Sequence, residues 1–215
     1  MRPASFLSRP LRLAFRLLYN ELAWTYDLVS WSVSVGQWRA WQRTALPYLA
    51  KGRVLEIAHG SGNFLLDLHA SGLEAVGLDL SQSMGRLARQ KLRAHEVQIP
   101  LVRGRVQALP FAGGAFPCLV STFPTEFIID PQAIAEFHRV LAPGGALVIV
   151  PAAQITGPAL PDRLAEWLFR ITGQSAVPGL APIENPYTGA GFSTRIERVR
   201  LPRSVVTVVI AEKNR

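Results

Sequence analysis

The chain has 215 residues, of which 49% are hydrophobic and 18% are charged. This composition excludes a disordered chain and leaves enough length for one ordinary domain with a substantial core. The formal net charge of +8 is carried by twenty arginines against three lysines and indicates an anionic partner, such as phospholipid, nucleic acid or an acidic substrate. The single cysteine, Cys118, excludes an internal disulfide framework and fits a reducing compartment.

Residues 5–22 have the pattern of an amphipathic helix. Its apolar residues fall on one arc of a helical wheel: Leu7, Leu11, Phe15, Leu18 and Leu22. Its basic residues fall together on the opposite side: Arg9, Arg12 and Arg16. The pattern fits peripheral contact with an anionic membrane, and it also fits a helix that packs on the domain with its arginines in water.

The sequence predicts no transmembrane helix and no signal peptide. The longest uncharged runs, 106–125 and 140–161, are interrupted by glycine and proline and fit strands and turns. Arginines interrupt every apolar stretch near the N-terminus that could form the core of a signal peptide. We therefore expect a cytoplasmic protein, with any membrane contact on the cytoplasmic face.

Four of the five tryptophans lie between residues 24 and 41. A second helix is predicted over residues 37–49, which include Trp38 and Trp41. Aromatic residues gathered ahead of the first strand indicate a lid or platform. We therefore predict an N-terminal helical extension or lid over residues 1–50 and one α/β domain over residues 51–215.

From residue 53 onward, short apolar runs alternate with helical periods. The predicted strands are 53–58, 75–80, 99–103, 117–122, 145–150, 195–201 and 204–211. The predicted helices are 63–71, 82–95, 131–141 and 160–172. This alternation predicts a Rossmann-like, seven-stranded, mostly parallel sheet with helices on both faces. The last two strands form a hairpin, so we expect the last strand to run antiparallel to the rest.

Two dipeptides predict the ends of the helix over residues 131–141. Asp130 supplies a carboxylate N-cap, and Pro131 suits the first helical position. Gly144-Gly145 is predicted to end the helix.

The stretch VLEIAHGSG at residues 54–62 has the pattern of a buried strand that leads into a glycine turn. It lacks the third glycine of the dinucleotide fingerprint, which lets a helix pack close to a pyrophosphate. The next strand ends in Asp79, where an acid accepts hydrogen bonds from a ribose diol. Both nicotinamide dinucleotides and S-adenosylmethionine (SAM) carry such a diol, so Asp79 indicates a ribose without choosing between them.

Five segments together resemble the class I SAM-dependent methyltransferases in order and spacing. They read VLEIAHGSG (54–62), VGLDLSQSM (76–84), GRVQALPF (104–111), FPCLVSTFPTEF (116–127) and RVLAPGGALVIV (139–150). Within that family the chain is similar to the branch of quinone-biosynthesis and small-molecule or phospholipid N-methyltransferases. The resemblance implies a methyltransferase domain over residues 51–215, SAM as methyl donor, S-adenosylhomocysteine as product, and no metal.

In this family the first motif surrounds the methionine part of SAM, the second holds the ribose, and the loop after residue 104 lies beside the adenine. The cofactor-binding residues that the resemblance implies are Tyr26, Glu56, Ala58, His59, Gly60, Gly62, Asp79, Leu80, Met84, Arg105, Val106, Gln107 and Phe123. The segment around Tyr26 is implied to close over SAM, and residues 121–123 to border the transferred methyl group.

Three positions depart from the family pattern. His59 stands in the first motif, beside the amino-acid end of SAM. Arg105 replaces an acid that accepts from the adenine amino group, and arginine cannot accept. We expect that amino group to bind backbone or Gln107, or Arg105 to turn toward the surface. Pro117 replaces an aspartate. Because the turn and Asp79 remain, SAM binding is still expected.

Methyl transfer from a sulfonium is an in-line displacement that needs alignment more than covalent catalysis. A base is required only when the nucleophile arrives protonated. The resemblance implies Tyr26, Glu126 and His59 as candidates for catalytic residues, although His59 also fits the role of a turn residue. Asp27 and Tyr187 are further candidates, each with a structural role as the alternative.

Three functions fit the sequence. The first is a SAM-dependent methyltransferase for a small or amphiphilic acceptor that is lipid- or quinone-like, which the amphipathic N-terminus favours. The second is a nucleic-acid methyltransferase, suggested by the charge. Residues 121–125 read STFPT and lack the Asn/Asp-Pro-Pro-aromatic turn of base-flipping enzymes, so we expect no specific nucleic acid. The third is a non-catalytic SAM-fold protein or a nicotinamide enzyme, although no substrate domain is expected after residue 155.

Overall fold

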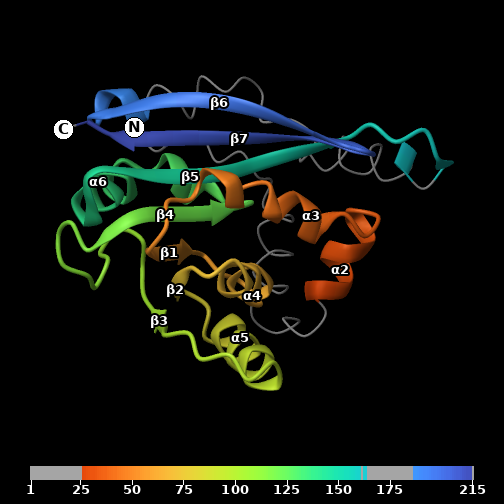
Figure 1. The fold of residues 1–215 in the computed structure, drawn as a ribbon, viewed down its shortest axis with the longest axis horizontal. Helices are drawn as coiled ribbons and strands as arrows, with labels where there is room; N and C mark the ends of the chain where they lie inside the picture. Colours follow the sequence, from red (N-terminus) through yellow and green to blue (C-terminus); the bar gives the residue numbers. More distant parts are fainter. Residues whose placement is uncertain (1–25, 161, 164–185, 215) are drawn as a thin grey trace.

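The computed structural model describes residues 26–160, 162–163 and 186–214. They form a seven-stranded sheet in the order β3-β2-β1-β4-β5-β7-β6 (Figure 1). The strands are β1 (Arg53–Ile57), β2 (Glu74–Asp79), β3 (Leu101–Arg103), β4 (Phe116–Thr122), β5 (Leu141–Ile155), β6 (Phe192–Leu201) and β7 (Ser204–Lys213). Neighbours from β3 to β5 run parallel, whereas β7 runs antiparallel to β5 and β6. The predicted Rossmann-like fold and its antiparallel last strand are confirmed.

Five helices and two 3-10 turns that are described over their whole length accompany the sheet, besides the helical residues 160, 162–163 and 186–189. The helices are α2 (Tyr26–Val33), α3 (Trp38–Arg43), α4 (Asn63–Ala70), α5 (Gln82–Ala94) and α6 (Pro131–Val140), and the turns are η2 (Leu46–Tyr48) and η3 (Glu126–Ile129). None of these helices has both the length and the apolarity that a membrane crossing requires. The predicted helix over 5–22, Trp24 and most of the predicted helix over 160–172 lie outside the described residues. The division of the chain near residue 50 stays a prediction.

Successive strand residues face opposite sides of the sheet, and each side has its own core. Leu55 and Ile57 of β1 pack with Ile134 and Phe137 of α6 on one side. Val54 of β1 packs on the other side, in a cluster that takes residues from α3, α4 and α5: Trp41, Phe64, Leu65, Leu68 and Leu92. Helices therefore cover both faces, as predicted, and the sheet edge at the strands' carboxyl ends is left for the site.

The predicted helix over residues 37–49 is wrong in length. Helix α3 ends at Arg43, and the chain then tightens into the 3-10 turn η2, which contains Pro47. Proline lacks the N–H that a continuing α-helix needs, which accounts for the break.

The predicted helix end at Gly144-Gly145 is also wrong. Helix α6 starts at Pro131 with Asp130 as its N-cap, as predicted, but it ends at Val140 because Leu141 already pairs with Phe116 of β4. The glycines lie where the ladder between β4 and β5 shifts register, opposite Pro117. A Cβ atom on Gly145 would lie 2.8 Å from the carbonyl oxygen of Pro117. The glycine pair therefore serves this irregularity in the sheet and not the helix terminus.

Candidate functional site

The glycine turn connects β1 to α4 and is held from two sides. Ala58, Gly60 and Gly62 have positive φ values of 58°, 55° and 82°. The N–H of Ala58 donates to the carbonyl oxygen of Leu78 in β2 at 2.7 Å. A Cβ atom on Gly62 would lie 2.8 Å from the Cβ atom of Ala88 in α5. Gly62 is therefore required by the close approach of α5 as well as by its backbone conformation.

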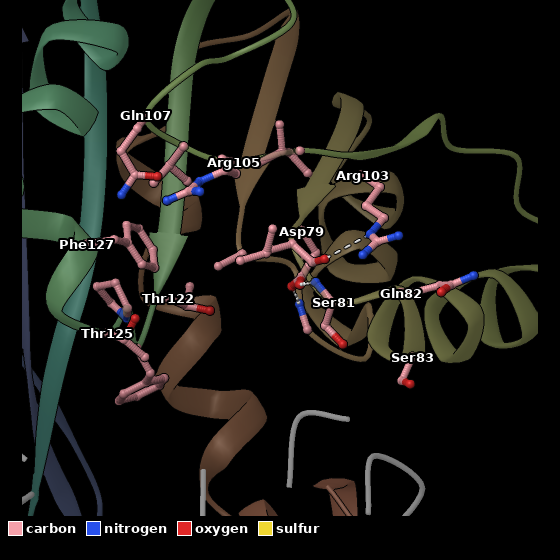
Figure 2. A pocket seen from close by; sticks show the side chains of 18 residues that line it. Asp79, Ser81, Gln82, Ser83, Arg103, Arg105, Gln107, Thr122, Thr125 and Phe127 are labelled. Atoms are coloured by element: carbon pink, nitrogen blue, oxygen red, sulfur yellow. Dashed lines mark hydrogen bonds between the residues drawn. The ribbon is translucent and has the colours of Figure 1, made fainter. Parts of the chain in front are cut away.

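Asp79, the last residue of β2, organises the turn through its carboxylate. Oδ2 accepts from the N–H of Gly60 at 2.9 Å, and Oδ1 accepts from the N–H of Ser81 at 2.7 Å (Figure 2). Each carboxylate oxygen can accept more than one hydrogen bond. Asp79 therefore retains capacity for hydroxyl groups of a ligand.

A pocket of about 630 Å³ lies at the carboxyl ends of β1 to β4, where open α/β sheets bind their ligands. Eight of the residues predicted for cofactor binding line it: Ala58, Gly60, Asp79, Leu80, Arg105, Val106, Gln107 and Phe123. Figure 2 shows Asp79 on one side and Gln107, Phe127 and Thr122 on the other. The structure thus brings together residues from four separate strand ends.

Other predicted residues lie away from the lining of this pocket. Glu56, His59 and Gly62 lie in or next to the glycine turn but do not line the pocket. Met84 of α5 also does not line it and is fully buried. Glu126 is exposed at the first position of η3, outside the pocket. Tyr26 begins α2, and its side chain lies outside the described part. Tyr187 is a core residue, with its hydroxyl donating to the carbonyl oxygen of Ile128 at 2.9 Å and with its pKa raised by burial.

Nine lining residues were missed by the sequence prediction, which did place Thr122 in the segment 121–123 beside the transferred methyl group: Leu78, Ser81, Gln82, Ser83, Arg103, Gly104, Pro124, Thr125 and Phe127. All of them lie close to the carboxyl end of a strand that the sequence did predict. Strand ends therefore carried a usable signal, because the carboxyl ends of neighbouring parallel strands share one edge of the sheet. What no local pattern showed is which side chains at those ends face the pocket.

Glu56 is an unusual buried acid beneath the turn. Its side chain is 1% exposed, and Oε2 has no hydrogen-bond partner among the described residues. Burial raises the pKa of Glu56 well above its ordinary value, and the charges of Asp79 and Asp67 raise it further. The unpartnered Oε2 fits an N–H group of a ligand, and a positive charge on that group would lower the pKa of Glu56 again.

The contacts of His59 are those of a residue that stabilises the turn. It is 5% exposed, and its Nδ1 lies 2.8 Å from the carbonyl oxygen of Gly60, which fits an N–H at that position. Burial lowers the pKa of His59, although the charge of Asp79 opposes this. Its Cδ2 also fills the space beside Gly77, where a Cβ atom would lie 2.9 Å away. Burial and packing therefore disfavour the charged form of the ring.

The loop after β3 presents Arg105 and Gln107 to the pocket. Nε2 of Gln107 donates to Oδ2 of Asp130 at 2.8 Å, while Oδ1 of Asp130 caps α6. Figure 2 shows the Gln107 side chain held so that its oxygen faces the pocket. Arg105 is exposed and lines the same rim. The Gln107 side-chain oxygen is therefore a hydrogen-bond acceptor with a fixed orientation in this loop. Arg105 places a positive charge at the edge of the pocket.

Helix α3 fixes the end of β4 from outside the pocket. The ring of Trp38 stacks on Phe123 with 4.2 Å between centroids. Nε2 of Gln42 donates to Oγ1 of Thr122 at 2.9 Å. Nε1 of Trp41 donates to Oγ of Ser204 in β7 at 2.8 Å. One short helix thus sets the position of two pocket residues.

Asp67 of α4 anchors this helix. Its side chain is 1% exposed and accepts from Nη2 of Arg39 at 2.8 Å and from Nη2 of Arg43 at 2.6 Å. Nε of each arginine also donates to the same carboxylate. Two arginines that each donate through Nε and Nη2 to one buried acid give α3 a fixed orientation.

Helix α2 is connected to the other side of the turn through Asp27. Its carboxylate accepts from Oγ of Ser61 at 2.6 Å, Nδ2 of Asn63 at 2.9 Å and Nζ of Lys91 at 2.6 Å. Burial raises the pKa of Asp27, but the hydrogen bonds from Lys91 and Ser61 bring it below its ordinary value. Asp27 is therefore a paired carboxylate that joins α2, the turn and α5.

Known proteins share this arrangement. Residues 54–145 match the family described as a methyltransferase domain. The chain is 32% identical over 179 residues to the demethylmenaquinone methyltransferase of Thermus thermophilus, which covers 80% of this chain and 79% of that protein. It is 36% identical over 151 residues to the ubiquinone/menaquinone biosynthesis C-methyltransferase UbiE of Syntrophotalea carbinolica, covering 67% and 64% of the two chains.

The fold is also that of a solved structure from Methanococcus maripaludis, described as a candidate SAM-dependent methyltransferase. The two superpose with a TM-score of 0.69 at 16% identity, over 92% of this chain and 94% of the other. With the matched family and the relatives above, this makes the protein an enzyme whose methyl donor is SAM. The chain belongs to the class I SAM-dependent methyltransferases, in the branch of the quinone-biosynthesis methyltransferases.

Proposed function

We propose that this enzyme methylates a ring carbon of a reduced, quinone-like acceptor. The observation that carries the proposal is one continuous pocket that joins the Asp79 side to the aromatic end of β4. A methyl donor on the first side and a flat ring on the second would be aligned for transfer. The names of the Thermus thermophilus and Syntrophotalea carbinolica relatives support a quinone-type acceptor. The reduced hydroquinone is the nucleophile, because an oxidised quinone ring is itself electron-poor.

We call the residues at the ends of β1, β2 and β3 the donor half, and their chemistry supports SAM binding. Asp79 retains acceptor capacity for the ribose hydroxyls. Oε2 of Glu56, buried and without a partner among the described residues, fits the ammonium group of the methionine end. The pocket-facing oxygen of Gln107 fits the adenine amino group. When bound, SAM supplies an electrophilic methyl group for an in-line displacement.

We call residues 122–127 at the end of β4 the acceptor half. Aromatic and proline side chains line it and fit a flat ring: Phe123, Pro124 and Phe127. Arg103 and Arg105 belong to the donor half, but they add positive charge to the same pocket, which favours an acceptor that binds as an anion. Among the described lining residues Asp79 is the single carboxylate and histidine is absent, so binding of a phenolate replaces the need for a base.

The first test is calorimetric titration with S-adenosylhomocysteine, with NADH as the control ligand. Micromolar binding of S-adenosylhomocysteine and none of NADH is expected. The second test incubates the enzyme with methyl-labelled SAM and reduced demethylmenaquinone, and a label on a ring carbon is expected. Label on an oxygen, or turnover of RNA in place of the hydroquinone, would overturn the acceptor proposal. The catalytic roles of Tyr26, His59 and Glu126 stay predictions, which Tyr26→Phe, His59→Asn and Glu126→Gln test in the same assay.

We also propose that residues 5–22 bind the cytoplasmic face of an anionic membrane, close to a lipid-like acceptor. The net charge of +8 supports this, as do two apolar side chains of α2, Leu28 and Trp31, which are 65% and 63% exposed. The full chain should sediment with vesicles that contain anionic lipid and not with neutral vesicles. Replacing Arg9, Arg12 and Arg16 by glutamate should abolish this, and unchanged sedimentation of that variant would refute it.

A further inference from the structure

The position of Thr122 places its side chain beside the acceptor. Strand β4 pairs with β1 on the side opposite to β2, with Val120 level with Glu56. Two residues further along, Thr122 and Ala58 both line the pocket. The ribose site proposed at Asp79 lies across β1 from Thr122. Thr122 therefore borders the part of the pocket that a SAM molecule anchored at Asp79 leaves for the acceptor.

The hydroxyl of Thr122 has a defined orientation. It accepts from Nε2 of Gln42 at 2.9 Å, and a hydroxyl that accepts one hydrogen bond still has its own hydrogen to donate. Gln42 is 7% exposed, and its Oε1 has no hydrogen-bond partner among the described residues. Figure 2 shows the Thr122 oxygen directed toward the open centre of the pocket. The neighbouring Ser121 differs, because its hydroxyl donates to the carbonyl oxygen of Ile57 at 2.9 Å and is buried.

Gln42 can hold this orientation because its helix does not move freely. Asp67 anchors α3 through two arginines, and Trp41 is bonded to Ser204 across the sheet. Phe123, directly after Thr122, has a φ of 51° and is held by the Trp38 ring and by its N–H, which donates to the carbonyl oxygen of Val150 at 2.7 Å. A positive φ in a phenylalanine is strained and persists only where its surroundings determine it.

We propose that Thr122 is a specificity residue whose O–H donates to the ring oxygen next to the carbon that is methylated. This inference rests on the proposed function and adds the group that recognises the acceptor. The hydrogen bond stabilises the phenolate and orients the neighbouring carbon. That carbon forms the new C–C bond, the methyl–sulfur bond breaks with its electron pair on sulfur, and the ring C–H proton passes to water.

The test is a thermodynamic cycle that combines one substitution in the protein with one change in the ligand. Thr122→Val removes the hydroxyl at nearly constant shape, and α-naphthol is compared with naphthalene, which lacks the oxygen. With S-adenosylhomocysteine bound, Thr122→Val should weaken α-naphthol binding by about tenfold and leave naphthalene unchanged. Thr122→Ser, the matched control, should retain wild-type affinity for both. kcat/KM for reduced demethylmenaquinone should fall by about tenfold in Thr122→Val.

The outcomes separate this inference from the function on which it rests. If wild type binds S-adenosylhomocysteine and methylates the hydroquinone, but Thr122→Val weakens both aromatic ligands equally, the hydroxyl has only a packing role and the inference fails. A Thr122 hydroxyl that donates to Gln42 instead would give that same result. If wild type does not methylate the hydroquinone, the proposed function fails, whereas a surviving difference between α-naphthol and naphthalene would still support oxygen recognition by Thr122.

Discussion

The donor half and the acceptor half of the pocket are built by different kinds of contact. In the donor half, Asp79 bonds backbone N–H groups 19 and 2 residues away, at Gly60 and Ser81. In the acceptor half, Thr122 is positioned by Gln42 across 80 residues, and α3 is tied to β7 by a bond that spans 163 residues. Local backbone geometry forms the first half, and long-range side-chain packing forms the second.

This difference has a functional meaning. A donor half made of a turn and a strand end can stay the same while the acceptor half changes with the helix that packs on it. Acceptor choice would then be set by α3 as much as by the residues that touch the acceptor. Variants that act on one half and spare the other test this separation.

The largest expected effect is on cofactor affinity in Asp79→Asn. A hydrogen bond to a charged group contributes about 1.5–3 kcal/mol, and the amide loses both the charge and one acceptor oxygen. S-adenosylhomocysteine should bind about 100-fold more weakly in calorimetry. Asp67→Asn removes a carboxylate from the acceptor side and is the matched control, with near-native affinity expected. Equal losses in both variants would mean that the two halves are not separate.

Asp67→Asn should instead lower stability. The change leaves Arg39 and Arg43 without their carboxylate, but these arginines are 55% and 52% exposed and stay hydrated. We therefore expect a loss of about 2 kcal/mol, less than for a fully buried pair. Denaturant unfolding measures it, and KM for the acceptor should rise because α3 positions Thr122. Glu212→Gln, in the exposed pair with Arg195, should change stability by less than about 0.5 kcal/mol.

The difference between local and long-range contacts also determines which features can be predicted from the sequence. The glycine turn and Asp79 were found because a local pattern encodes them, and the pairing of strands followed from their alternation with helices. Thr122 belongs to the family-like segment 116–127, but Gln42 lies 80 residues away and in no such segment, so the contact between them is not predictable. The predicted role of Gly144-Gly145 is wrong for a related reason, although the predicted helix over 131–141 ends within one residue of α6. Gly144-Gly145 is a good local signal for a helix end, and pairing of Leu141 with β4 overrides it.

Glu56→Gln tests the donor half through pH. The raised pKa of Glu56 means that the folded chain keeps its proton after the unfolded chain has released it. Its contribution to stability is therefore full below the ordinary carboxyl pKa and is lost as pH rises through the raised value. Thermal unfolding between pH 4 and pH 8 should therefore show Glu56→Gln gaining stability relative to wild type as the pH rises. A constant difference across this range would contradict a protonated Glu56.

The smallest effect expected among the variants near the site is that of Asp27, which tests whether α2 acts on the donor half or on the acceptor half. The Asp27 side chain is 48% exposed, so Asp27→Asn should cost about 0.5 kcal/mol at pH 7. The pKa of Asp27 is lowered in the folded chain, so its contribution is present above the ordinary value and is lost as pH falls through the lowered one. The stability gap between wild type and variant, followed by thermal unfolding, should therefore close toward pH 3.

Because Asp27 bonds Ser61 and Asn63 beside the turn, the variant Asp27→Asn should weaken S-adenosylhomocysteine binding and leave the acceptor KM unchanged. The reverse pattern would assign α2 to the acceptor half.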